Sequence, residues 1–193
     1  MKALVVWGGW EGHEPENVAN FCAELLTAEG VIVEVTNNQD RFKDIDSMLD
    51  LSLIVPVITM GWLTEEQRGP IFRAVSERGV AVAGCHGGMC DAFREDTEWQ
   101  FMTGGQWVAH PGDTNVTYKV EISDKTHPIT AGIEDFWVTS EQYYLHTDPG
   151  NNVLATCSFP TDGVDGPHVQ NPCKMPTVWT KYYGKGRIFY NAL

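Results

Sequence analysis

A histidine flanked by glycines forms the motif in this chain that most clearly points to chemistry. The sequence Gly84-Cys85-His86-Gly87-Gly88 follows a short apolar run and precedes a short stretch of helical character. Its form matches the tight turn Gly-x-nucleophile-x-Gly, in which glycines permit a strained backbone that presents one side chain at a strand end. An imidazole titrates near neutral pH, so we expect His86 to act as a general acid or base. Gly87 and Gly88 would then line the substrate site; the alternative is a structural histidine.

A second loop with the composition of a site lies near the N-terminus. Residues 8–14 have the sequence GGWEGHE and separate an apolar run from an amphipathic stretch. Glycines let the backbone approach a ligand closely, and a helix start offers free N–H groups, so Gly9, Trp10, His13 and Glu14 are expected to bind substrate. The alternative is that His13 and Glu14 are solvated residues that cap the helix. The loop lacks the Gly-x-Gly-x-x-Gly pattern of dinucleotide sites, and no cofactor is expected.

A third cluster has the sequence EQYYLH at residues 141–146. In an extended segment Glu141 and Tyr143 share one face, while His146 lies on the other. We expect Glu141 to orient or assist His86, and Tyr143 and His146 to contact substrate. An exposed edge segment is the alternative.

Tryptophans gather near the ends of the expected strands. Aromatic rings beside carboxylates and imidazoles suit a sugar, whose C–H faces stack on the rings while its hydroxyls bond the polar groups. We therefore expect Trp62, Trp107 and His110 to join Trp10 in binding substrate. Core packing is the alternative for each tryptophan taken singly.

Short apolar runs alternate with helical patterns through the first 93 residues. Strands are expected at residues 4–7, 31–35, 51–57 and 80–83, and helices at residues 15–30 and 64–79. The first helix carries a continuous apolar stripe made of Val18, Phe21, Cys22, Leu25 and Leu26. In the second helix, Pro70 predicts a short first turn and a restart at the proline.

This order of elements is typical of βαβ units and predicts a mostly parallel sheet with helices on both faces. Ligands of such sheets bind beyond the carboxyl ends of the strands. The loops that carry His13 and His86 must therefore meet at one end of the sheet. For that reason the strands at residues 4–7 and 80–83 should be inner strands, adjacent or nearly so.

The pattern changes after residue 93. Residues 94–111 are rich in loop signals, and residues 116–122 alternate between apolar and polar in the manner of a strand with one wet face. Another strand is expected at residues 153–157, and Gly184-Lys185-Gly186 predicts a hairpin between residues 178–183 and 187–190. We expect antiparallel additions to one α/β domain that spans residues 1–193.

Composition narrows the classes of partner. The 193 residues include 13 Lys and Arg against 26 Asp and Glu, a net charge of −13, which disfavours nucleic acid and anionic membranes. The five cysteines fit no disulfide or zinc pattern and indicate reduced thiols. The first apolar run is shorter than the core of a signal peptide, so we expect a cytoplasmic protein. A homo-oligomer is left open.

An ordered set of motifs resembles the trehalose-utilisation (ThuA-like) family. The set comprises Gly-x-His-Gly-Gly at residues 84–88, His-Pro-Ile-x-x-Gly at 127–132, Glu-x-Tyr at 141–143 and Pro-x-Val-Trp followed by Tyr-Gly-x-Gly-Arg-x-Phe-Tyr at 176–190. The resemblance covers essentially the whole chain. It implies a flavodoxin-like, class I glutamine amidotransferase-like fold, and a role in the breakdown of disaccharides or keto-sugars.

Two features depart from related proteins. True amidotransferases have cysteine at the centre of the turn, where this chain has His86, and Cys85 one position earlier should be turned away; we therefore expect no glutaminase activity. The family continues into a closing helix beyond the position of Leu193, so a truncated chain is the expectation at the C-terminus.

Three hypotheses for function follow. The leading one is an enzyme that acts on a sugar or keto-sugar, with His86 as acid or base assisted by Glu141. The second is a non-catalytic sugar-binding or regulatory domain. The third is a metal-dependent hydrolase, whose ligands would come from His13, His86, His110 and His146. These four histidines lie in four different loops without ligand spacing, so the sequence leaves metal binding open.

Overall fold

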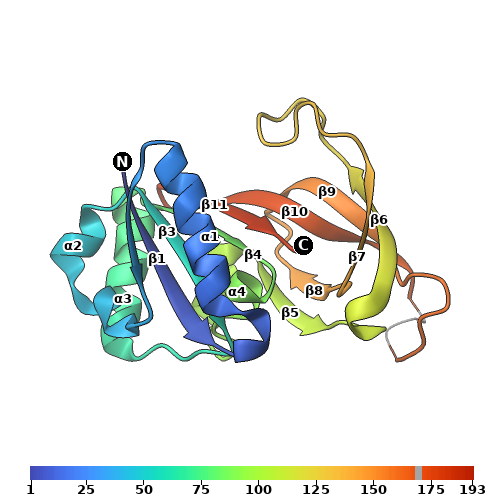
Figure 1. Ribbon diagram of the computed structural model, residues 1–193, viewed down its shortest axis with the longest axis horizontal. Helices are drawn as coiled ribbons and strands as arrows, with labels where there is room; N and C mark the ends of the chain where they lie inside the picture. The colour runs from blue at the N-terminus through green and yellow to red at the C-terminus, as the bar shows by residue number, and fades with distance from the viewer. Residues whose placement is uncertain (168–170) are drawn as a thin grey trace.

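One long sheet runs through the molecule, with helices gathered around its N-terminal half (Figure 1). The computed structural model describes residues 1–167 and 171–193. In this described part nine strands form the sheet, in the order β2-β1-β3-β4-β11-β10-β9-β6-β7, and β5 pairs with β8 beside it. The strands are β1 (Lys2–Gly9), β2 (Ile32–Thr36), β3 (Leu53–Thr59), β4 (Ala81–Cys85), β5 (Gly105–Ala109), β6 (Val116–Ile122), β7 (Phe136–Ser140), β8 (Tyr144–Thr147), β9 (Asn152–Phe159), β10 (Cys173–Tyr183) and β11 (Gly186–Asn191). The helices are α1 (Pro15–Ala28), α2 (Ile45–Leu49), α3 (Glu65–Arg73), α4 (Gly87–Cys90) and α5 (Thr97–Thr103), with shorter turns η1 (Glu11–His13), η2 (Gln39–Lys43), η3 (Ala74–Arg78) and η4 (Asp113–Asn115).

The parallel half of the sheet confirms the predicted βαβ architecture. Strands β1 to β4 are mutually parallel, and β3 alone separates β1 from β4. Helix α1 covers one face, where Ala19 packs on Val5 and Val57. Helices α2 and α3 lie on the other face, where Met48 and Ile71 belong to the main core (Figure 1).

Helix α1 differs from its predicted apolar stripe. Val18, Cys22 and Leu26 pack on the sheet, but Phe21 and Leu25 are 59% and 54% exposed. The buried face is centred on Ala19, so these two large side chains fall at its edge. Their burial, expected from the spacing alone, is therefore a wrong prediction.

Helix α3 also differs from expectation, because it continues through Pro70 instead of restarting there. A capping box between Thr64 and Gln67 begins the helix as predicted. The residue before a proline is normally pushed out of the helical region by a clash that involves its Cβ, and Gly69 has no Cβ. The helix therefore passes the proline and ends in the π-helical turn η3.

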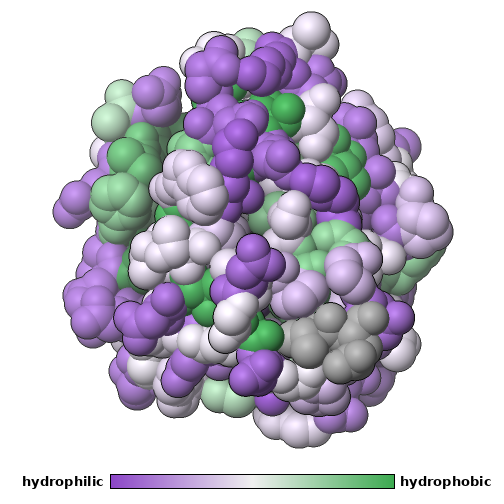
Figure 2. Space-filling view, turned by 90° about the vertical axis from the view of Figure 1, so that its right-hand side faces the viewer, coloured by the Kyte–Doolittle hydropathy of each residue, from purple (hydrophilic) through white to green (hydrophobic). Residues whose placement is uncertain are grey.

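The antiparallel half continues the same sheet. Strands β10 and β11 form the predicted hairpin, and β11 also pairs in parallel with β4, which joins the two halves. As expected, one face of strand β6 is buried and the other faces solvent. Figure 2 shows the end of the molecule on this side, where hydrophilic residues are interspersed with smaller hydrophobic areas.

A helix and a strand replace the loop expected over residues 94–111. Asp96 caps α5 by accepting a hydrogen bond from the backbone N–H of Trp99, and Gly104 ends the helix at a φ of 86°. These are ordinary start and stop signals, so the sequence did contain the information. The described residues include no helix long and apolar enough to cross a membrane.

Trp179 packs strand β10 against α5 and β11 in the core. It is fully buried on β10, its indole N–H donates to the carbonyl of Thr103, and its ring lies 4.4 Å from that of Tyr190 on β11. We expect Trp179→Ala to lower the free energy of unfolding by about 3–5 kcal/mol, because it leaves a large cavity. Urea denaturation followed by circular dichroism measures this change.

The matched control is Trp137→Ala on β7, where the ring is 68% exposed. Its effect should stay within about 0.5 kcal/mol. Equal losses in the two variants would contradict the role given to Trp179.

Candidate active site

The carboxyl ends of β1, β3 and β4 bring the predicted loops together. The rings of His13 and His86 lie 5.0 Å apart, which confirms the expectation that their loops meet at one end of the sheet. Thr59, the last residue of β3, lies between these loops in sequence order and contributes its hydroxyl to the site. The parallel half thus supplies the imidazoles.

The turn at His86 has the strained backbone that its glycines predicted. His86 has a φ of 48° and a ψ of −143°, a region that non-glycine residues seldom occupy. Two backbone bonds hold it: the His86 N–H donates to the carbonyl of Asn191, and the Tyr190 hydroxyl donates to the carbonyl of His86. A Cβ on Gly87 would lie 2.6 Å from His13, so a glycine is needed there for the loops to meet.

Both ring nitrogens of His86 have partners. Nδ1 lies 3.1 Å from the carbonyl oxygen of Ala192, and Nε2 lies 3.1 Å from Oε2 of Glu141. A carbonyl only accepts hydrogen bonds, so Nδ1 carries a proton. A neutral imidazole would then face the acceptor oxygen of Glu141 with a lone pair, and the contact requires a cation between the two groups. The His86–Glu141 pair therefore holds either a second proton or a metal ion.

Surrounding groups fix this pair. The side chain of Glu141 is only 11% exposed and accepts a hydrogen bond from the hydroxyl of Tyr143. The Tyr143 ring stacks on His86 with the centroids 4.2 Å apart, and burial raises the pKa of its phenol well above the ordinary value. Tyr118 donates to the backbone carbonyl of Glu141. The segment is buried, so the alternative of an exposed edge does not apply to these residues.

His13 is held beside the pair by contacts with Thr59 and Trp10. Its Nδ1 lies 2.9 Å from the hydroxyl of Thr59, and its ring meets the edge of Trp10 at 4.7 Å. Burial lowers the pKa of His13, and the neighbouring charge of His86 lowers it further. Gly9 allows this approach, because a Cβ there would lie 1.9 Å from the carbonyl oxygen of Thr59.

A cavity of about 160 Å³ opens above these residues, and we call it the site cavity. Its lining brings together predicted residues from both halves of the sheet: Trp10, His13, Trp107, His110, Glu141 and Tyr143. Sequence reasoning missed the four other lining residues, which are Thr59, Met60, Asp91 and Arg94. Thr59 follows from the rule that ligands bind beyond strand ends, while nothing in the sequence marked Asp91 and Arg94.

Asp91 and Arg94 form an ion pair on one side of the site cavity. Arg94 donates to both carboxylate oxygens of Asp91, at 2.5 and 2.9 Å, and its guanidinium lies 4.5 Å from the ring of Trp107. The nearby Nδ1 of His110 is buried without a hydrogen-bond partner in the part of the chain that the structure describes. This wall offers hydrogen-bond donors beside an aromatic face.

A second cavity of about 250 Å³ lies on the other side of the imidazoles, and we call it the rear cavity. His13 lines both cavities, and His86, Gly88 and Cys85 line the rear one. His13 is thus accessible from both cavities, and His86 from the rear one.

Five predicted site residues do not line either cavity: Gly9, Glu14, Trp62, Gly87 and His146. Trp62 is 71% exposed and lines a separate cavity beside Leu63, His146 is exposed on β8, and Glu14 is exposed at the start of α1 with a φ of 46°. For Glu14 the structure agrees with the alternative of a helix-start residue. Gly9 contributes through its backbone, as described above.

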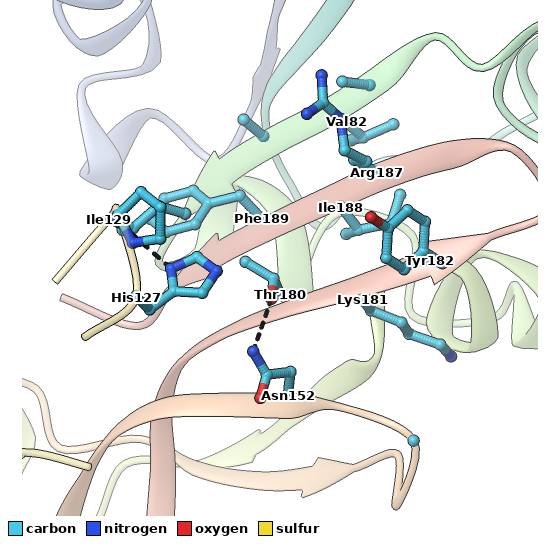
Figure 3. A pocket seen from close by; sticks show the side chains of 14 residues that line it. Val82, His127, Ile129, Asn152, Thr180, Lys181, Tyr182, Arg187, Ile188 and Phe189 are labelled. Atoms are coloured by element: carbon cyan, nitrogen blue, oxygen red, sulfur yellow. Dashed lines mark hydrogen bonds between the residues drawn. The ribbon is translucent and has the colours of Figure 1, made fainter. Parts of the chain in front are cut away.

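The largest cavity, of about 660 Å³, lies elsewhere on the sheet. It covers β4, β10 and β11, and Figure 3 shows His127 and Ile129 on one side of it and Tyr182 and Arg187 on the other. Its lining shares no residue with the site cavity. Size alone therefore does not identify the site.

Two groups of side chains in the described residues have the donors to hold a metal ion. His13, His86 and Glu141 form one, and His110, Asp113 and Glu141 the other; within each group the ligand atoms lie within 4.8 Å of one another. The site therefore combines a proton-transfer pair with a set of metal donors.

The thiols near the turn are not activated. Burial, together with the neighbouring Cys22, raises the pKa of Cys85 to about 11. Burial also raises the pKa of Cys90. A thiolate nucleophile requires the opposite shift.

Comparison with known proteins settles the family. The model of the trehalose utilisation family, ThuA, matches residues 2–193. The chain belongs to the trehalose-utilisation family. A ThuA-like protein of Bacteroides uniformis is 18% identical, with a TM-score of 0.80 over 100% of this chain and 81% of that one.

More distant structures share the fold. A cytoplasmic protein of Salmonella typhimurium is 13% identical, with a TM-score of 0.68 over 99% of this chain and 87% of that one. A glutamine amidotransferase of Thermotoga maritima is 11% identical, with a TM-score of 0.57 over 100% of this chain and 74% of that one. A search of curated protein sequences finds no match. The predicted amidotransferase-like fold is confirmed, and membership of the family supports a general role in sugar utilisation.

The environment of His13 predicts an unusual titration. In the parent protein the pKa of His13 should lie below the ordinary value of about 6.5, and His86→Asn should raise it only part of the way back, because burial is the larger cause. An NMR titration of the imidazole signals measures both values. A pKa above 6.5 in the parent protein would contradict the lowering that burial is expected to cause.

Proposed function

We propose that this ThuA protein is an enzyme that acts on a sugar or keto-sugar, with His86 as the acid–base group and Glu141 as its partner. The observation that carries the proposal is the His86–Glu141 contact beneath a cavity lined with aromatic rings. With Nδ1 bound to Ala192, only Nε2 can exchange a proton with substrate or with Glu141. Such a pair stores one proton, which Glu141 presents to the site cavity and His86 to the rear cavity.

The lining of the site cavity supports a sugar as the ligand. Trp10, Trp107 and Tyr143 offer aromatic surface, and His110 offers a buried nitrogen with no hydrogen-bond partner in the described residues. The cavity is smaller than the roughly 300–1,000 Å³ of most ligand pockets, so it suits one ring of a sugar. The remainder of a disaccharide would lie outside.

Loss of the imidazole should separate chemistry from stability. We expect His86→Ala to lower sugar turnover by about 10²–10⁴-fold, the usual contribution of an acid–base group. The variant should still fold, with a modest fall in melting temperature because Ala192 and Glu141 lose their imidazole partner. Glu141→Gln should also lower turnover, because an amide cannot accept the shared proton. Turnover of a 3-keto-disaccharide and thermal melting of each variant measure the two effects.

The control is His127→Ala, in the largest cavity, which should leave turnover unchanged. If His86→Ala unfolds several degrees lower but processes the sugar normally, the imidazole is structural. If the protein binds sugar without turnover, the second hypothesis, a binding domain, replaces the enzyme.

The proposal includes the absence of glutaminase activity. The centre of the turn is an imidazole, and the raised pKa of Cys85 leaves its thiol protonated near pH 7. We expect a glutamine-analogue electrophile to label neither Cys85 nor Cys90 within the time that labels an amidotransferase. Mass spectrometry of the intact protein measures labelling, and protection of Cys85 by glutamine would overturn this part of the proposal.

The proposed partner is a small-molecule sugar, and a homo-oligomer remains an open alternative. The charge of −13 supports neither nucleic acid nor an anionic membrane as a partner. We propose a cytoplasmic location, in line with the similar Salmonella protein that is described as cytoplasmic.

A further inference from the structure

We infer that His13, His86 and Glu141 together bind one divalent transition-metal ion. The inference rests on the proposed function for the place of the site, and it changes what occupies the space between His86 and Glu141. That space requires a cation, as argued above, and an ion meets the requirement as well as a proton does. His86 and Glu141 would then be ligands of the ion, which would supply an activated water in place of the proton that the pair otherwise holds.

The donor set suits this class of metal. Two imidazoles and one carboxylate are ligands of Zn²⁺ and related ions, and catalytic zinc sites commonly have three protein ligands and one open position. The open position here would face either the site cavity or the rear cavity, because His13 lines both. A substrate or water could therefore reach the ion.

The surrounding bonds are those that metal-ligating histidines usually have. Such a histidine donates its other ring N–H to a backbone carbonyl, a carboxylate or a water, which fixes the ring. His86 fits this pattern, since Nδ1 is bound to Ala192 and Nε2 faces Glu141. The hydroxyl of Thr59 holds the ring of His13 in the same way.

The distances require one small movement. Metal–ligand bonds of about 2.0–2.2 Å place tetrahedral ligand atoms roughly 3.3 Å apart. The His86–Glu141 separation of 3.1 Å is already close to that value. The ligand atom of His13 lies within 4.8 Å of the others, so it needs to approach by up to roughly 1.5 Å.

The competing group of His110, Asp113 and Glu141 is less suitable. The side chain of Asp113 is 80% exposed, so solvent competes for it, and 3.9 Å separates it from His110. Glu141 is common to both groups, and the two other ligands therefore distinguish them.

Binding of Co²⁺ and Zn²⁺ to the chelator-treated full chain tests the inference. We expect one equivalent of Co²⁺ to give the visible absorption of a tetrahedral site and Zn²⁺ to displace it. His13→Ala and Glu141→Gln should abolish the signal, whereas His110→Ala and His127→Ala should retain it. Thr59→Val, which removes only the hydroxyl, should weaken binding by about 10- to 100-fold.

NMR of the parent protein tests the inference without any variant, so misfolding of a variant cannot affect the result. Zn²⁺ should shift the ring nitrogens of His13 and His86 and leave those of His127 in place. Absence of saturable binding, or shifts at His110 without shifts at His13, overturns the inference.

Sugar turnover, measured with and without Zn²⁺, separates this inference from the proposed function. Turnover that depends on His86 in a protein that binds no metal contradicts the metal site and leaves the proposed function standing. Metal binding that depends on His13, without any handling of sugar, contradicts the proposed function alone.

Discussion

The contact between Nε2 of His86 and Oε2 of Glu141 is the interaction on which the rest of the site depends. It places two hydrogen-bond acceptors 3.1 Å apart in a partly buried position, because Nδ1 is already committed to Ala192. Two acceptors at that distance repel each other unless a cation lies between them. The fold therefore holds the site in a state that demands either a proton or a metal ion. The need for a cation between His86 and Glu141 accounts for both acid–base chemistry and metal binding at this site. Both properties therefore follow from the same placement of these two side chains.

The two halves of the sheet contribute different residues to this site. The parallel half supplies His13 and His86 from loops at the carboxyl ends of β1 and β4. The antiparallel half supplies Glu141 and Tyr143 from the segment before β8. Strand β11 joins the halves by pairing with β4, and Asn191 at its end also accepts the bond from the backbone of His86.

The sequence predicts the first half of this construction better than the second. Apolar runs closed by glycines locate β1 and β4, and the rule for parallel sheets then brings His13 and His86 to one edge. Such reasoning depends on local patterns that recur every few residues. It fails where the outcome depends on neighbours from distant segments, as for Phe21, which faces solvent because Ala19 occupies the centre of the buried face.

The same limit explains the candidate site. The glycine-flanked His86 is visible in the sequence because a strained turn needs glycines beside it, whatever lies around it. Asp91 and Arg94 were not predicted, because oppositely charged residues three positions apart are common in sequences. Their place in the site is apparent only in the structure, where the ring of Trp107 from another strand lies next to the guanidinium. Trp62 shows the converse, since a tryptophan near a strand end faces solvent when no second element covers it.

The glycines of the site are explained by packing distances rather than by flexibility. A side chain on Gly9 would collide with the backbone of β3, and one on Gly87 would collide with the imidazole of His13. Both positions lie where two loops approach each other most closely, so each glycine shortens the gap between groups that must act together. The strained φ of His86 belongs to the same construction, since bonds to Asn191 and from Tyr190 hold the turn from the neighbouring strand. The strain is thus balanced by β11, a strand of the central sheet, and the imidazole is held in place before any ligand arrives.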